Sequence, residues 1–312
     1  GLSIVEWNPI SGSVPPMGQH DWEQEFAKYQ QTPEFIYVNS GMTLDEYKYI
    51  FYIEWIHRFI ARLAGLVYAF PVFWFLFRKT IPWKEFGIYF LMGILFIGQA
   101  FMGWFMVASG LIDKPAVDHF RLTLHLLLAL TLLGLALWTA FGHRYGFSSP
   151  AKAKWSSLSK LAAASFVILL VQISYGGLVA GLKAGHVSNT WPLMLGQWIP
   201  KGIFGANGFN WLNLFEAPQT VVYIHRWFAF LGLLLVPWAY WQAKKRNYPA
   251  EIQRGLLWLI VAVTTQITLG VTVVLTNVNV PAASIHQAGA VTLFWLAIFF
   301  IHRLRALDRA RA

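Results

Sequence analysis

Long apolar stretches alternate with short polar segments along almost the whole 312-residue chain. Each stretch holds about 20 residues, the length that an α-helix needs to cross a hydrocarbon layer of roughly 30 Å. There are seven of them, near residues 50–77, 86–108, 119–141, 160–182, 219–242, 255–276 and 283–302. The pattern therefore predicts an all-α polytopic membrane protein with seven spans.

Composition supports a bilayer as the main partner of the chain. Apolar residues make up 57% of it and charged residues only 12%, whereas soluble domains carry about a quarter charged residues. The net charge of +10 does not indicate a nucleic-acid partner, because Lys and Arg are more than twice as frequent in the segments after the first, third, fifth and seventh spans as in the others. The positive-inside rule then places residues 1–45 outside and the C-terminus inside.

The absence of cysteine narrows the possible chemistry. It excludes disulfides, iron–sulfur clusters and thiolate ligation of haem. Metal chemistry in this chain must therefore rest on histidine and carboxylate ligands.

The chain contains an internal repeat. An Ile-His-Arg-Phe tetrapeptide starts at Ile56, and Ile-His-Arg-Trp starts at Ile224; a further histidine follows each of them two spans later. The second half reads as four spans and the first as three, which predicts two pseudo-symmetric four-helix bundles in tandem, with the first helix of the N-terminal bundle missing from this chain. The expected parts are an outer loop segment (1–45), an N-terminal half-bundle (46–142), an inner linker (143–159), a C-terminal half-bundle (160–303) and an inner basic tail (304–312).

A Gln-x-x-x-Gly signature occurs on the spans that run from inside to outside. It appears at Gln99/Gly103, Gln172/Gly176 and Gln266/Gly270. Close helix packing at the glycine is the simpler interpretation.

Four of the nine histidines lie within spans, where an ionisable side chain is costly and indicates function. They are His57, His125, His225 and His286. Each lies toward the outer side on a span that runs inward, so each half presents two imidazoles at matching depth, as bis-histidine ligation of a haem requires. Structural histidines bonded to neighbouring helices are the alternative. Zinc fits less well, because the ligands are spread over four helices.

Intramembrane charges accompany these histidines. Arg58, Arg62 and Arg226 need anionic partners, which haem propionates would supply; pairing with Glu54 or with lipid headgroups is the alternative. Glu54 stands one turn before His57, so only one of the two pockets acquires a carboxylate. Oxidation of a C–H bond would use such a group for protons or charge, whereas a salt bridge with Arg58 is the structural alternative.

Several segments together resemble the haem A synthase family, in the form found in mitochondria and many bacteria. They are Glu54-Trp55-Ile56-His57-Arg58, Arg121-Leu122-x-x-His125, Asn189-Thr190-Trp191-Pro192-Leu193-Met194, His225-Arg226 and His286-Gln287. The resemblance covers nearly the whole chain. It implies eight helices in two halves, and an oxidoreductase that converts the C8 methyl of haem O to a formyl group by successive hydroxylation and loss of water, giving haem A for cytochrome oxidase assembly.

The resemblance also implies roles for the site residues. Glu54, His57 and His125 would form the catalytic half that takes haem O, with the two histidines as iron ligands. His225 and His286 would ligate a resident haem b that transfers electrons. Some relatives carry a cysteine pair, so any thiol-linked step proposed for them is not expected here.

Partners and location are implied in the same way. Haem O would come from haem O synthase, electrons from an unidentified donor, and the membrane would be the bacterial cytoplasmic or the mitochondrial inner membrane; homo-oligomerisation is left open. Two competing functions remain at this point. One is a dihaem b-type electron-transfer cytochrome without substrate chemistry, and the other is a haem transporter.

Overall fold

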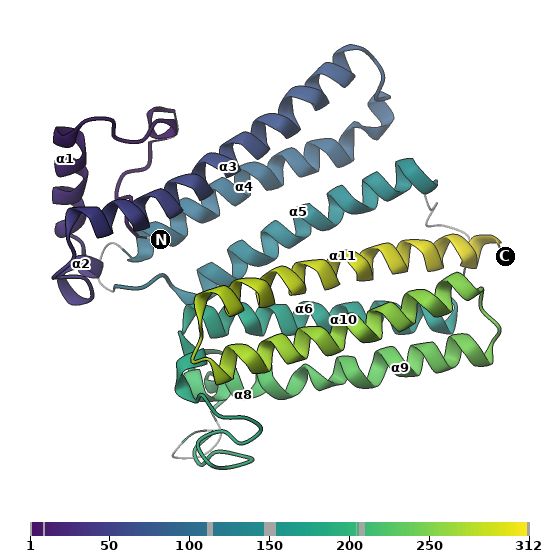
Figure 1. Cartoon of the computed structure of the whole chain (residues 1–312). Helices are drawn as coiled ribbons and strands as arrows, with labels where there is room; N and C mark the ends of the chain where they lie inside the picture. The colour runs from purple at the N-terminus through teal and green to yellow at the C-terminus, as the bar shows by residue number, and fades with distance from the viewer. Residues whose placement is uncertain are drawn as a thin grey trace. The chain divides into compact units, whose positions relative to one another are not determined.

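The computed structural model of the chain describes residues 2–8, 10–110, 115–146, 154–203, 205 and 210–310 (Figure 1). Within these ranges the chain forms helices and connecting segments, without a β-strand element. Seven of the helices are long and apolar enough to cross a membrane, which confirms the predicted fold class. Residues 147–153 of the expected inner linker and residues 311–312 of the expected tail lie outside the described ranges.

The membrane-length helices keep the order of the predicted spans. They are α3 (Leu44–Phe77), α4 (Phe86–Gly110), α5 (His119–Tyr145), α6 (Ser157–Gly181), α8 (Pro218–Phe228) with α9 (Phe230–Lys245) as one span broken at Ala229, α10 (Ala250–Leu275) and α11 (Val280–Ala310). The short elements are α1 (Gln19–Gln30), α2 (Pro33–Tyr37), α7 (Asn213–Glu216) and the 3-10 turns η1 (Ser11–Ser13), η2 (Trp83–Glu85) and η3 (Ala184–Val187).

Several helices extend beyond the apolar windows that predicted them, because polar side chains stabilise their ends. Thr43 and Glu46 form a reciprocal capping box that starts α3 at Leu44. At the other end of the chain, Arg305 pairs with Asp308 at 2.8 Å, and the hydroxyl of Ser159 donates to the same carboxylate at 2.7 Å. These buried contacts keep the charged last turns of α11 helical.

The chain divides into two compact units, Gly1–Leu132 and Leu133–Ala312. In the first unit, α1 packs on the start of α3 through a buried aromatic cluster of Trp22, Tyr29, Tyr47 and Phe51. The α4 helix packs against α3. This cluster fixes the segment that precedes the first span.

The second unit holds four spans that pack around a common core. The α6 helix packs against α8, α9 and α11, and α10 packs against α9 and α11, so each of these four spans has two neighbours among the other three (Figure 1). The chain direction brings the end of α6, the start of α8, the end of α10 and the start of α11 to one end of this bundle. We call it the histidine end, because His225 and His286 lie there. The pseudo-symmetric pairing of two such bundles stays a prediction.

Candidate functional site

The two histidines of the second unit face each other across the bundle. The ring centres of His225, on α8, and His286, on α11, are 6.4 Å apart, and the ring planes are nearly perpendicular at 87°. Two imidazoles on opposite sides of one metal ion, each bonded at about 2 Å through one nitrogen, place their ring centres roughly 6 Å apart. The observed spacing therefore fits two axial ligands of a single metal ion.

A haem fits this pair better than a metal held by protein ligands alone. Among the described residues there is no group of three or more His, Cys, Asp or Glu side chains that could hold a metal ion. A porphyrin supplies four equatorial nitrogens and needs only two axial ligands from the protein. His225 and His286 are thus the residues that would hold it.

A glutamine on the preceding helix holds each of these histidines. Gln172 Nε2 on α6 donates to the carbonyl of His225 at 2.9 Å and lies 3.1 Å from its Nδ1. Gln266 Nε2 on α10 does the same with His286, at 2.8 Å from the carbonyl and 3.2 Å from Nδ1. Because Nδ1 is engaged on both rings, Nε2 is the nitrogen left to bind a metal.

The glycines of the Gln-x-x-x-Gly signature give the imidazoles room. A methyl group at Gly176 would lie 3.2 Å from Cε1 of His225, and one at Gly270 would lie 3.0 Å from Cε1 of His286. Residues four apart share one helical face, so the glutamine and the glycine of one helix contact the same ring. The expectation of close packing at the glycine is confirmed, and the partner is the histidine.

The first unit supports its histidines differently. Gln99 Nε2 on α4 lies 3.2 Å from Nε2, not Nδ1, of His125 on α5, and a methyl at Gly103 would lie 3.3 Å from its Cε1. Nδ1 of His125 is buried without a hydrogen-bond partner among the described residues. His57, on α3, is exposed.

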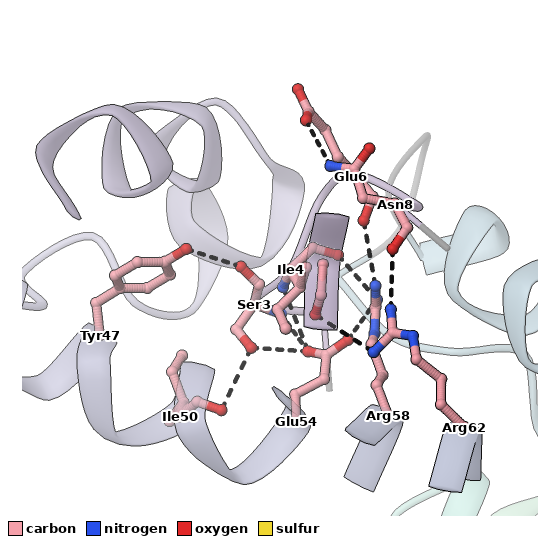
Figure 2. Close-up of polar contacts among 10 residues, drawn as sticks. Ser3, Ile4, Glu6, Asn8, Tyr47, Ile50, Glu54, Arg58 and Arg62 are labelled. Atoms are coloured by element: carbon pink, nitrogen blue, oxygen red, sulfur yellow. Dashed lines mark hydrogen bonds and ion pairs between the residues drawn. The ribbon is translucent and has the colours of Figure 1, made fainter. Parts of the chain in front are cut away.

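Glu54 anchors the N-terminal segment to α3, as Figure 2 shows. Its Oε2 accepts hydrogen bonds from the backbone N–H of Ser3 at 2.9 Å, the hydroxyl of Ser3 at 2.7 Å and the N–H of Ile4 at 3.3 Å. Its Oε1 accepts from Arg58 at 2.7 Å, which is the salt bridge weighed as an alternative. The carboxylate is buried, and these four donors match the roughly four lone-pair positions that a carboxylate offers.

The arginines after His57 bind backbone carbonyls of the same segment (Figure 2). Arg58 donates to the carbonyls of Glu6 at 3.2 Å and Ile4 at 3.0 Å. Arg62 donates to those of Asn8 at 2.9 Å and Gly12 at 3.3 Å. The structure thus supplies a role for both guanidinium groups besides the expected contact with an anion.

Arg226, next to His225, makes equivalent contacts in the second unit. It donates to the carbonyls of Ser188 at 2.6 Å and Thr190 at 3.1 Å. These hydrogen bonds hold the loop that follows α6. Its side chain is buried, and its Nε has no hydrogen-bond partner among the described residues. A buried guanidinium N–H without a partner fits an anionic group of a ligand.

An ion pair at the surface connects the N-terminal segment to α1. Lys28 Nζ lies 3.0 Å from Glu6 and 2.7 Å from Glu25. Hydrogen bonds to Glu25 and then Glu6 raise the pKa of Lys28, and the hydrogen bond from Lys28 lowers the pKa of Glu6. Both side chains are partly exposed, so the pair contributes little to stability.

Sequence reasoning missed two groups of residues. The three glutamines were interpreted only as part of a packing signature, although each lies one helix before an intramembrane histidine, and that repeated register was a usable signal. The contact of Ser3 with Glu54 could not be predicted from a local pattern, because the two residues are 51 positions apart in the sequence.

Seven membrane-length helices and a facing pair of histidines inside the second unit define an integral membrane protein with a candidate haem site. The COX15-CtaA family, described as cytochrome oxidase assembly proteins, matches residues 1–298, and the chain belongs to this family.

Similar proteins cover nearly the whole chain. The chain is 40% identical over 304 residues to the Heme A synthase of Parvibaculum lavamentivorans, which covers 97% of this chain and 86% of that relative. It is 41% identical over 314 residues to the Heme A synthase of Nitrosomonas eutropha, with 97% and 86% covered. For the Heme A synthase of Wolbachia pipientis the identity is 40% over 307 residues, with 98% and 85% covered.

Proposed function

We propose that this protein is a haem A synthase, an oxidoreductase that converts the C8 methyl of haem O to the formyl group of haem A through successive hydroxylation and loss of water. The observation that carries the proposal is the 6.4 Å spacing of His225 and His286. The names of the relatives support the same reaction. A bound haem b supplies an iron that alternates between ferric and ferrous states and so relays electrons.

The second unit is the better site for the resident haem b. Each of its histidines is held by a glutamine through both the ring and the backbone carbonyl. The first unit is the better site for haem O, because a substrate must enter and leave. There His57 is exposed and His125 has a single ring contact with Gln99.

Glu54, His57 and His125 form the substrate side in this proposal. The two histidines ligate the iron of haem O, and Glu54 holds a negative charge one turn from His57 to oppose positive charge that develops near the methyl group. Because its lone pairs already accept four hydrogen bonds, Glu54 acts through fixed charge and position more than as a free proton acceptor.

The arginines complete the two sites. Arg226 offers its unpartnered Nε–H to a propionate of haem b. Arg58 and Arg62 take the corresponding part for haem O, while they also hold the segment that covers the start of α3.

The remaining assignments concern the surroundings. The histidine end faces the periplasm or the intermembrane space, and the C-terminus lies inside. Haem O arrives from haem O synthase, and an external donor supplies electrons. Topology reporters near residues 30 and 200 should read outside, and reporters near 150 and 248 inside; the reversed pattern would overturn this orientation.

Haem extraction tests the proposed function directly. The protein is produced in cells that also make haem O, and its bound haems are separated by chromatography. Haem O or haem A beside haem B is the expected result. Haem B alone, in a protein that binds two equivalents, would instead indicate a dihaem electron-transfer cytochrome and contradict the synthase.

A further inference from the structure

We propose that Gln172 and Gln266 are positioning residues that fix the tautomer of the haem-ligating histidines and lower the reduction potential of the resident haem. In the haem-loaded protein, Oε1 of each glutamine accepts a hydrogen bond from Nδ1–H of its histidine, while Nε2 keeps its bond to the histidine carbonyl. This inference rests on the proposed haem b site at His225 and His286.

The position of the single N–H proton on each neutral imidazole leads to this arrangement. The carboxamide NH2 now faces both the histidine carbonyl and Nδ1. Donation to Nδ1 requires a ring that carries its proton on Nε2. Ligation of iron through Nε2 requires the opposite tautomer, with the proton on Nδ1. An NH2 group facing an N–H cannot form a hydrogen bond, so the carboxamide must turn.

The acceptor that the turned arrangement needs is already present. Oε1 of Gln172 and Oε1 of Gln266 are both buried and have no hydrogen-bond partner within the described residues. A buried amide oxygen without a partner is costly. A rotation that brings Oε1 to Nδ1–H and leaves Nε2 on the carbonyl satisfies the oxygen, the ring and the backbone at once.

Gly289 lies next to one of these oxygens, Oε1 of Gln266. A methyl group at this position would overlap Oε1 of Gln266, whereas its other neighbours lie farther away. Gly289 is one turn from His286 on the same helix, yet its near contact is the glutamine. A substitution here therefore excludes this oxygen from its unturned position without removing the ligand.

An acceptor on Nδ1–H makes the imidazole a stronger electron donor and favours the ferric state. Replacement of Gln172 or Gln266 by Leu should weaken ferric haem binding by about 10–100-fold. A tenfold greater loss for ferric than for ferrous haem corresponds to an upward potential shift of about 59 mV. Replacement by Glu, a charged and stronger acceptor, should shift the potential downward.

The experiment compares the haem-loaded wild type with Gln172→Leu, Gln172→Glu, Gln266→Leu and Gln266→Glu. The readouts are the redox titration of the low-spin haem, its EPR spectrum and the rate of haem loss. Gln99→Leu is the matched control, because Gln99 contacts His125 of the other unit; it should leave the potential of the resident haem unchanged.

Opposite shifts for Leu and Glu support the inference. A purely structural role of the glutamines predicts potential shifts of the same sign, or no shift, in the Leu and Glu variants that still bind haem. Either result would overturn the inference. If the glutamine variants fail to fold, Gly289→Ala replaces them; because its methyl excludes Oε1 of Gln266 from the unturned position, the potential should stay at or below that of the wild type. A raised potential in a haem-loaded Gly289→Ala protein would count against the acceptor role of Gln266.

Failure of this inference can be distinguished from failure of the proposed site. Loss of the low-spin haem in His225→Ala, together with unchanged potentials in the glutamine variants, would reject only the inference. A low-spin haem that persists in both His225→Ala and His286→Ala would reject the haem b site itself.

Discussion

The two histidine pairs differ in how firmly the protein holds them. In the second unit, two glutamines each bind a ring and a backbone carbonyl, and the rings stand 6.4 Å apart. In the first unit, Gln99 contacts a single ring nitrogen of His125, and His57 is exposed. A tightly held ligand pair suits a resident cofactor, since preorganisation lowers the cost of binding. A loosely held pair suits a group that must come and go.

The arginine after the first histidine of each pair is the feature that the two units share. Arg58 and Arg226 both donate to backbone carbonyls of a connecting segment, at 3.0 Å from Ile4 and 2.6 Å from Ser188. Only the first unit adds a carboxylate, Glu54, to this contact. The difference between the units therefore lies in Glu54 and in the glutamine contacts.

The largest expected effect is the loss of one whole haem. His225→Ala or His286→Ala should abolish the low-spin spectrum of the resident haem, because either change removes one of the two imidazoles that would hold its iron. His57→Ala and His125→Ala should keep that spectrum, because both residues lie in the other unit. Optical and EPR spectra of the purified proteins measure this. Equal loss in all four variants would remove the distinction between the two sites.

Substitution of Glu54 should have the next largest effect. Glu54→Ala should reduce haem A formation by about 10²–10³-fold, the usual cost of removing one group that stabilises transition-state charge, and should leave the resident haem in place. The assay is conversion of haem O by a protein replete in haem b. Near wild-type conversion would exclude Glu54 from the reaction.

Ser3→Ala is the control that separates charge from anchoring at Glu54. It removes the hydroxyl contacts with Glu54 at 2.7 Å and with the carbonyl of Ile50 at 3.3 Å, but leaves the carboxylate and its pair with Arg58. If the charge of Glu54 matters, Ser3→Ala retains most of the activity. A parallel loss in Ser3→Ala and Glu54→Ala would show that anchoring of the N-terminal segment is what matters.

Added methyl groups should produce smaller, graded effects. Overpacking typically costs about 1–3 kcal/mol, and the methyl would lie 3.0 Å from the ring in Gly270→Ala but 3.2 Å in Gly176→Ala. Resident haem should therefore be lost more readily in Gly270→Ala than in Gly176→Ala. Gly103→Ala, in the first unit, should affect haem O conversion and leave the resident haem unchanged. The rate of haem transfer to an excess of apomyoglobin, measured for each variant, gives the order of haem loss.

The smallest effect belongs to the surface pair of Glu6 and Lys28. Glu6→Gln should lower the free energy of unfolding by less than about 1 kcal/mol, and salt should reduce the difference. The pKa of Glu6 is lowered in the folded state. Its contribution is therefore present above the unfolded-state pKa and is lost as the pH falls through the folded-state pKa. Melting temperatures of both proteins across acidic pH test this; a difference that grows on acidification would contradict it.

Hydrophobic patterning predicted the seven spans, because about 20 apolar residues are a strong and local signal. It did not predict their ends. The start of α3 depends on the capping pair of Thr43 and Glu46, and the end of α11 depends on the contacts of Asp308 with Arg305 and Ser159. These polar interactions lie outside any apolar window. Helices α1 and α2 in the expected outer loop segment were missed for the same reason, since neither is long and apolar.

The site was predicted in part. Charge within a span singled out the histidines and arginines, because burial of an ionisable group in a bilayer requires a partner. The partners themselves depend on tertiary structure. Arg58 binds two backbone carbonyls besides Glu54, and Arg62 also binds two, and no composition or spacing rule specifies a carbonyl. The role of the glutamines became visible only when α6 and α10 were seen beside the histidine helices.

The loops between these helices set an order of assembly. Gln266 and His286 are 20 residues apart, on adjacent helices joined by residues 276–279, so their contact forms within one hairpin as it inserts. Gln172 and His225 are separated by 53 residues, and closure of that longer loop carries a larger entropic cost. Although the His225 side is synthesised first, we expect the His286 side, with its shorter loop, to form more readily once the helices have inserted, and the His225 side to complete the site. Haem capture would then report the last step of membrane folding.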